Sequence, residues 1–150
     1  MDALPALSKK VASRHGETHP ETLQVASAIF DLAQELLQHM YKEEQILFPY
    51  VSALDEASSS DQPAPVPFFG SAVNPIRMMM AEHNLADALL SSLRSLTRDY
   101  TPPADACMSF RALYGRLADL DADLREHMRI ENDVLFPRTV EMEASEVAFA

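Results

Sequence analysis

The sequence predicts an all-α protein, an antiparallel up-down four-helix bundle whose first helix is short. Its 150 residues include only 3 Gly but 8 Met, and no stretch alternates apolar and polar residues as a half-buried strand does. Apolar residues instead recur three and four positions apart, as on the buried face of a helix. A chain of this length is typical of one compact domain, so we expect a single domain over 1–150.

The first part of the chain predicts a short helix and a long one. Leu4 and Val11 lie on the apolar face of a first helix over 3–15, and Gly16 can stop it in a left-handed conformation. Thr18 and Glu21 form a capping-box pattern, which starts a long second helix over 19–56.

The second part of the chain predicts a loop and two further helices. Ser and Pro make up most of 58–67, and proline interrupts a helix, so we expect a loop over 57–74. A third helix is expected over 75–98 and a fourth over 103–141, with a bend or separate turn near 105–108. The mostly short connections imply the up-down order of the four helices.

The composition excludes several classes of function. A formal net charge of −11 repels phosphate backbones and anionic membrane surfaces, so we expect neither nucleic acid nor membrane as a partner. No apolar run approaches the roughly 20 residues of a membrane span, and the first residues lack a signal-peptide pattern, which predicts a cytoplasmic protein. Cys107 is the single cysteine, so it cannot form an intramolecular disulfide and is expected to be a small core residue.

An internal repeat carries the chemistry. Residues 39–49 (HMYKEEQILFP) and 127–137 (HMRIENDVLFP) are identical at six of eleven positions. Each copy contains His-x-x-x-Glu, His39/Glu43 in the first and His127/Glu131 in the second, and an acid lies four residues before each histidine. Residues four apart share one face of a helix.

The repeat predicts a buried metal site. Glu43, His127 and Glu131 fall on the register that otherwise holds Leu, Met and Ala, with His39 one step beside it, and no Lys or Arg shares this register. A buried carboxylate requires a proton, a cation or a metal, since leaving it unpaired costs several kcal/mol.

The bundle brings the two copies together. The second and fourth helices of an up-down bundle run parallel on a diagonal, so the two motifs face each other, and His83 joins them from the third helix. Three imidazoles and two carboxylates suit iron, manganese or zinc better than calcium or magnesium. Two bridging glutamates further favour two metal ions. His15 and His19 lie beside the turn between the first two helices and are expected to be too distant to bind the metal.

The chain resembles the iron-sulfur cluster repair di-iron proteins, the regulators of cell morphogenesis and NO signalling within the hemerythrin-like superfamily. The resemblance covers nearly all 150 residues and rests on both repeats, together with 15–21, 75–76, 80–83, 102–107 and 111–114. It implies a di-iron centre with an oxo or hydroxo bridge, bound by three histidines and bridged by two glutamates: His39, His83, His127, Glu43 and Glu131. It also implies that Glu35 and Glu82 line a polar path to the metals, where they can act as catalytic acids.

The same resemblance implies a role in nitrosative and oxidative stress. Such a protein repairs damaged iron-sulfur clusters by donating iron to client proteins, or reduces nitric oxide at a diferrous site, with nitric oxide or oxygen as small ligands. We expect a monomer or a weak dimer. Two family features are missing: a histidine on the start of the first helix, and an N-terminal domain containing a Cys pair. The sequence is therefore either a fragment or a five-ligand site with an open position, which would lower the occupancy of the second iron.

Two other classes of function stay open. One is a non-catalytic oxygen or redox sensor of the hemerythrin type, or a simple iron-binding protein, against which the acids Glu35 and Glu82 argue. The other is a metal-free interaction bundle, in which Glu43 and Glu131 would lack a partner.

Overall fold

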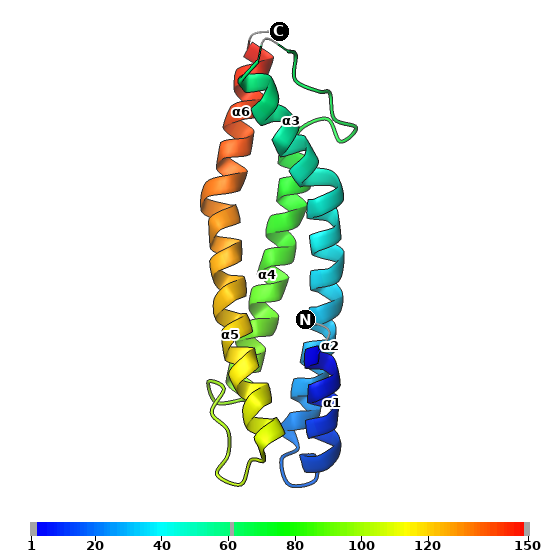
Figure 1. The fold of residues 1–150 in the computed structure, drawn as a ribbon, viewed down its shortest axis with the longest axis vertical. Coiled ribbons are helices and arrows are strands. Elements are labelled where there is room, and N and C mark those ends of the chain that lie inside the picture. The colour runs from blue at the N-terminus through cyan, green and yellow to red at the C-terminus, as the bar shows by residue number, and fades with distance from the viewer. Residues whose placement is uncertain (1–2, 61, 149–150) are drawn as a thin grey trace. The chain divides into compact units, whose positions relative to one another are not determined.

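The computed structural model describes residues 3–60 and 62–148, which form helices and connections with no strand among them. In chain order the elements are α1 (Ala3–His15), α2 (Glu21–Lys42), η1 (Glu43–Leu47), α3 (Phe48–Ser58), α4 (Val73–Leu96), α5 (Met108–Ile130), η2 (Glu131–Leu135) and α6 (Phe136–Ala148) (Figure 1). The all-helical prediction is confirmed. Within the described ranges, none of the helices combines the length and the apolar content that a membrane span needs.

The chain divides into two compact units. Unit 1 comprises Met1–Leu36 and Leu85–Glu126, and unit 2 comprises Leu37–Asn84 and His127–Ala150. Both copies of the sequence repeat and His83 fall in unit 2, whereas His15, His19 and Glu35 fall in unit 1.

The elements η1 and η2 are π-helical turns inserted at equivalent positions of the repeat. The N–H of Phe48 donates to the carbonyl of Glu43, and the N–H of Phe136 donates to that of Glu131. These bonds reach back five residues, whereas an α-helix reaches back four. A proline follows each phenylalanine, and because proline has no N–H and crowds the preceding turn, the regular bond cannot form there.

Unit 1 is built from α1 and parts of α2, α4 and α5. The helices α1 and α2 run antiparallel through the turn at 16–20 (Figure 1). Leu4 of α1, Leu32 of α2 and Leu117 of α5 line one small cavity, so these three helices pack on one another. Asp121 of α5 is fully buried and accepts hydrogen bonds from the Arg94 guanidinium at 2.9 Å and the Tyr100 hydroxyl at 2.7 Å, which tie α5 to the end of α4.

Two helix ends in unit 1 differ from the sequence prediction. The helix α4 ends at Leu96, before the expected residue 98, because Arg98 and Asp99 have φ values of 50° and 58°, outside the right-handed helical region. The helix α5 begins at Met108 and not at 103, because residues 101–107 form a turn in which the Ala106 N–H donates to the carbonyl of Pro103 at 3.0 Å. The bend expected near 105–108 is therefore where the helix starts.

The helix ends in unit 2 also differ somewhat from expectation. The expected loop over 57–74 is shorter, because α3 ends at Ser58 and α4 begins at Val73, and α6 continues to Ala148 although the helix was expected to end at 141. The last turns of α6 stay helical because Met142 packs on the core of unit 2 and Glu143 accepts hydrogen bonds from the neighbouring connection.

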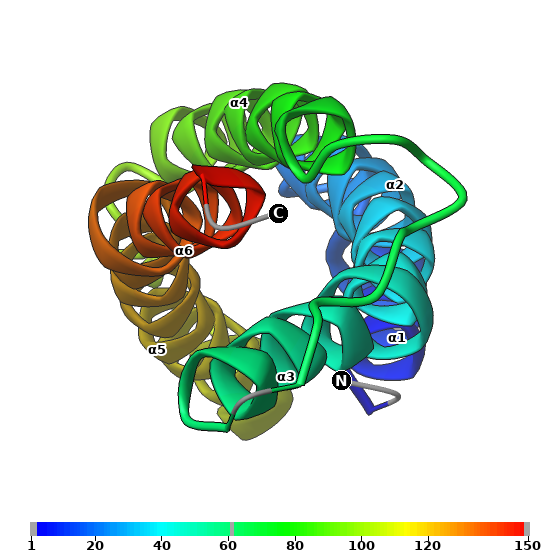
Figure 2. The same ribbon diagram turned by 90° about the horizontal axis from the view of Figure 1, so that it is seen from above.

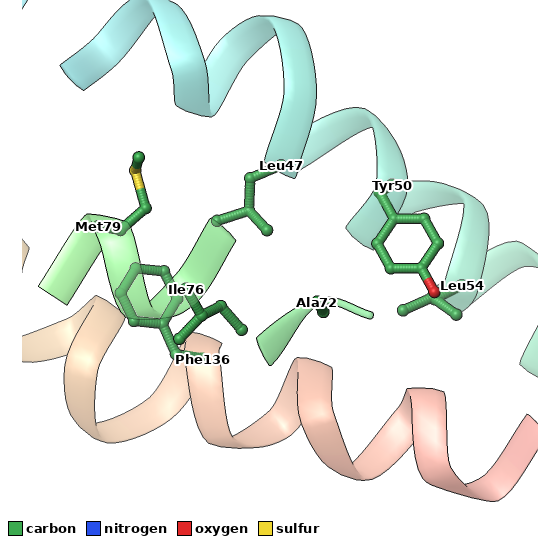
Figure 3. Packing of buried hydrophobic residues seen from close by; sticks show 7 residues of the cluster. All are labelled: Leu47, Tyr50, Leu54, Ala72, Ile76, Met79 and Phe136. Carbon is green, nitrogen blue, oxygen red and sulfur yellow. The ribbon is translucent and has the colours of Figure 1, made fainter. Parts of the chain in front are cut away.

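The core of unit 2 is an apolar cluster drawn from three helical stretches. Figure 3 shows side chains of η1 and α3, of α4 and of α6 pointing toward one another. The buried members of this cluster are Leu47, Tyr50, Leu54, Ala72, Ile76, Met79 and Phe136. Leu47 and Phe136 belong to the sequence repeat, so the segments that carry the histidines and glutamates also anchor the core.

The Glu143 carboxylate holds the end of the connection between α3 and α4, which is drawn in Figure 2, by hydrogen bonds. Glu143 of α6 accepts hydrogen bonds from the Ala72 N–H at 2.8 Å, the Tyr50 hydroxyl at 2.7 Å and the Ser71 hydroxyl. Burial raises the pKa of Glu143, but the three donors outweigh burial and hold the pKa below its ordinary value. The ionised carboxylate therefore stabilises the fold.

We predict that Glu143→Gln lowers the free energy of unfolding by about 1–3 kcal/mol at about pH 7, because it removes charge-assisted hydrogen bonds. Since the folded-state pKa of Glu143 is lowered, its contribution is present above the pKa of the unfolded chain, about 4.3, and is lost as pH falls through the folded value. Urea unfolding followed by circular dichroism should show the difference shrinking below about pH 4. Glu141→Gln, an exposed position on the same helix, is the control, and a pH-independent difference would contradict the prediction.

Candidate metal centre

Four buried side chains converge in unit 2. His39 lies in the last turn of α2, Glu43 begins η1, His83 lies on α4 and Glu131 begins η2. One nitrogen or oxygen atom from each lies within 4.8 Å of the others. The residues are 6%, 2%, 4% and 4% exposed in that order, so the cluster is shielded from water.

The hydrogen bonds of the two histidines fix which ring nitrogen carries the proton. His39 Nδ1 lies 2.8 Å from the carboxylate of Glu82, and His83 Nδ1 lies 2.8 Å from the amide oxygen of Asn132. Both partners are acceptors, so each Nδ1 carries the hydrogen in a neutral ring and each Nε2 keeps a lone pair. The two Nε2 atoms are 3.1 Å apart and point to the same space.

The two glutamates face these nitrogens without a donor between them. Glu43 Oε1 lies 2.9 Å from His39 Nε2, and Glu131 Oε2 lies 3.1 Å from His83 Nε2. Both oxygens are buried and have no hydrogen-bond donor among the described residues. Four electron-pair donors in one buried space require a positive charge. Two imidazoles and two carboxylates suit a divalent transition metal, because such metals are commonly bound by this mixture of nitrogen and oxygen ligands.

The pKa values of two of these groups are shifted by their neighbours in the cluster. Burial lowers the pKa of His39, but the carboxylates of Glu43 and Glu82 raise it above its ordinary value. Burial raises the pKa of Glu131, whereas His83 and His127 lower it. A raised pKa favours a proton on His39 in the absence of a metal, and a metal bound there would displace that proton.

His127 lies at the edge of the cluster. Its Nε2 is 3.0 Å from Glu131 Oε1 and 4.0 Å from Glu43 Oε2, so the two copies of the repeat meet as the bundle argument predicted. The burial expected from its register is wrong, since the side chain is 52% exposed although its ring nitrogen faces the cluster.

The family of the chain follows from a comparison with known domains. The model of the family described as "Hemerythrin HHE cation binding domain" matches residues 1–139. The chain belongs to this family. Its fold is the all-helical hemerythrin fold, and the buried histidines and glutamates of unit 2 are a cation-site candidate of that domain.

Curated relatives of this hemerythrin domain carry names that refer to iron-sulfur clusters. The chain is 37% identical over 137 residues to the "Probable iron-sulfur cluster repair protein" of Haemophilus influenzae. It is 36% identical over 137 residues to the "Iron-sulfur cluster repair protein YtfE" of Yersinia pestis and of Yersinia pseudotuberculosis. Each match covers 91% of this chain but 56% of the relative, so the chain spans little more than half the length of these relatives.

The two acids expected beside the metals have different surroundings in this hemerythrin domain. Glu82 accepts from His39 Nδ1 and pairs with the Lys42 ammonium through its other oxygen. Burial raises the pKa of Glu82, but Lys42 and His39 lower it below its ordinary value. Glu35 is exposed and lies in unit 1.

Two residues of the site escaped the sequence reasoning. Asn132 orients His83, and Lys42 holds Glu82. The repeat contained a signal for Asn132, since it directly follows Glu131, but only the rotation of the π turn directs its amide toward α4. Lys42 lies off the apolar register and is partly exposed, so the apolar spacing gives no sign that it is near the site.

The other histidines have partners within unit 1. His15 Nε2 lies 3.1 Å from Cys107 Sγ, and His19 Nε2 lies 2.9 Å from the carboxylate of Asp105. Neither is part of the four-residue cluster. Cys107, expected in the core, is only partly buried.

We predict that Glu82→Ala lowers the metal affinity by about 10–100-fold, because an imidazole ligand without its carboxylate partner loses orientation and basicity. Chelator competition with Fe(II) or with Co(II) as a spectroscopic probe would measure the change. Glu35→Ala removes an exposed acid of α2 with the same change in charge and should leave the affinity unchanged. Equal affinities for wild type and Glu82→Ala would contradict the role assigned to Glu82.

Proposed function

We propose that the chain binds two iron ions through five side chains, with the two carboxylates bridging the ions: His39, His83, His127, Glu43 and Glu131. The observation that carries this proposal is the pair of buried glutamate oxygens that have no hydrogen-bond donor among the described residues, each 2.9–3.1 Å from an imidazole nitrogen that keeps a lone pair when the ring is neutral. Paired His and Glu ligands on facing helices are the usual donor set of di-iron bundles. The names of the relatives support iron over manganese or zinc.

The function that this site supports best is repair of damaged iron-sulfur clusters, with iron-sulfur proteins as clients. The relatives that bear this name are longer than the chain, and the present residues contribute the part that would hold the iron. When bound in the reduced state, the iron pair would supply adjacent positions for nitric oxide and the electrons for its reduction, or an iron ion for transfer to a cluster.

The residues around His39 provide a path for protons. Lys42, Glu82 and His39 form a continuous series from the partly exposed ammonium to the buried imidazole. A proton can reside on Glu82 Oε2 or on His39 Nδ1, which are 2.8 Å apart. Glu35, one turn before His39 on α2, is a further candidate for proton delivery from solvent. An oxygen carrier would favour a pocket without such donors, so this series favours reactive chemistry over reversible oxygen binding.

We predict that Glu43→Ala/Glu131→Ala abolishes stoichiometric iron binding, since it removes both bridging carboxylates. Iron quantitation and Mössbauer spectroscopy on anaerobically reconstituted protein would test this. The matched control is Glu44→Ala/Asp133→Ala, which removes two exposed acids from the same π turns with the same change in net charge. Iron retention in the first double variant, or absence of iron in wild type, would overturn the di-iron proposal. Circular dichroism of both metal-free variants separates loss of iron from loss of fold.

We predict that the reduced, iron-loaded protein converts nitric oxide to nitrous oxide or restores activity to a nitric-oxide-damaged iron-sulfur dehydratase. Gas chromatography measures the first reaction and recovery of dehydratase activity measures the second. Iron-loaded protein that does neither, but changes its absorption spectrum reversibly with oxygen, would support the sensor interpretation instead.

A further inference from the structure

Unit 2 contains a solvent-open cavity that is separate from the metal cluster. The cavity has a volume of about 990 Å³ and is bounded by α3, the connection between α3 and α4, and the last turns of α6. Its walls include Leu54 and Ala57 on α3, Val66 on the connection, and Glu143 and Glu146 on α6. Ligand-binding cavities in proteins commonly span roughly 300–1,000 Å³, so this one can hold a substantial ligand.

The connection presents an apolar wall that is held in place. Val66 is 94% exposed and stands between Pro65 and Pro67, whose rings fix their φ angles. The Gly70 N–H donates to the Pro67 carbonyl at 3.1 Å, and the Asn74 side chain donates to the Phe69 carbonyl at 2.9 Å. These bonds hold the end of the connection over 67–74, and the proline rings at 63, 65 and 67 restrict the backbone of the rest, which reduces the conformational entropy lost when a ligand covers it.

The wall also offers acceptors in place of donors. Prolines at 63, 65 and 67 have no N–H. Among the described residues, no backbone hydrogen bond involves 62–66. The carbonyl groups of this extended stretch are therefore available to a donor-rich ligand.

The charges around the cavity are all of one sign. The sequence contains no Lys or Arg over 43–76 or over 139–150, whereas Asp55, Glu56, Glu143 and Glu146 lie on α3 and α6. The three groups that donate to Glu143 are neutral, so its negative charge has no cation beside it. The cavity therefore favours a cationic ligand.

We propose that this cavity binds a short extended segment of a partner protein in which basic and apolar side chains alternate. The apolar side chains would cover Pro63, Pro65 and Val66, which are exposed in the cavity lining, and the basic ones would pair with Glu146 and the free carbonyl groups. The stretch of α3 from Tyr50 to Ser58 that lines the cavity extends about 12 Å at 1.5 Å per residue, the length of about four extended residues. A second copy of this chain fits poorly, because its net charge is −11.

Three labelled pentapeptides provide a direct test with the full chain: acetyl-Arg-Leu-Arg-Leu-Arg-amide, its Arg-Ser counterpart and its Glu-Leu counterpart. In fluorescence anisotropy titrations the Arg-Leu peptide should bind saturably, and its affinity should fall as the salt concentration is raised. The Arg-Ser peptide should bind roughly tenfold or more weakly, because it lacks apolar side chains, and the Glu-Leu peptide should not bind. Absence of saturable binding by the Arg-Leu peptide, or equal binding of the two Arg peptides, would overturn the proposal.

Matched variants locate the binding. Glu146→Lys should lower the affinity for the Arg-Leu peptide at least about threefold. Glu17→Lys makes the same change in charge at an exposed acid of unit 1 and should have little effect on this affinity. Val66→Ser should lower the affinity for the same peptide about threefold to tenfold. Leu23→Ser changes an exposed apolar residue of unit 1 and should not lower this affinity. Peptide-induced amide shifts in NMR spectra should concentrate in 50–58 and 62–71. Equal weakening by a variant and its control, or shifts elsewhere, would overturn the assignment of the cavity.

Discussion

The arrangement of unit 2 depends on two buried carboxylates that face two imidazole lone pairs. Glu43 Oε1 and Glu131 Oε2 have no hydrogen-bond donor in the part of the chain that the structure describes, and the Nε2 atoms of His39 and His83 are 3.1 Å apart. Such a cluster is repulsive unless a positive charge enters it, and the cost of leaving it unpaired is several kcal/mol. The surrounding fold must hold these groups together in the absence of a cation, and a bound metal then returns stability to the fold.

The sequence repeat holds these groups together because each copy contributes residues both to the histidine–glutamate cluster and to the apolar core. Each glutamate is the first residue of a π turn, and its carbonyl accepts the N–H of the phenylalanine five residues later. Phe136 packs in the apolar cluster and also stacks on the ring of His83, with centroids 5.7 Å apart. The Leu-Phe-Pro segment that follows each glutamate therefore fixes the position of the glutamate backbone. The proline in this segment disfavours the regular α-helical hydrogen bond and so favours the π turn.

Much of this arrangement follows from elementary patterns in the sequence, and the remainder depends on details that patterns do not contain. Apolar spacing was sufficient to predict helices, and the repeat was sufficient to predict that His39, Glu43 and Glu131 would meet. The π turns were not predicted, because apolar spacing alone does not distinguish a single π turn from an α turn. The start of α5 at Met108 was missed because Pro102 and Pro103 suit the first turn of a helix as well as the turn that they form. The exposure of His127 was missed because the register gives the face of a helix, but not whether another helix covers it.

The three histidines differ in their surroundings, and this difference makes the proposed centre asymmetric. His39 donates to a carboxylate that Lys42 holds, whereas His83 donates to the neutral amide of Asn132. A carboxylate partner makes an imidazole a stronger ligand than an amide partner does. His127, with its side chain 52% exposed, is the ligand that water reaches most easily. An iron ion that relies on His127 would therefore exchange faster than one bound by His39. In a protein that donates iron, this asymmetry allows one ion to leave while the carboxylates and the buried histidines keep the site assembled.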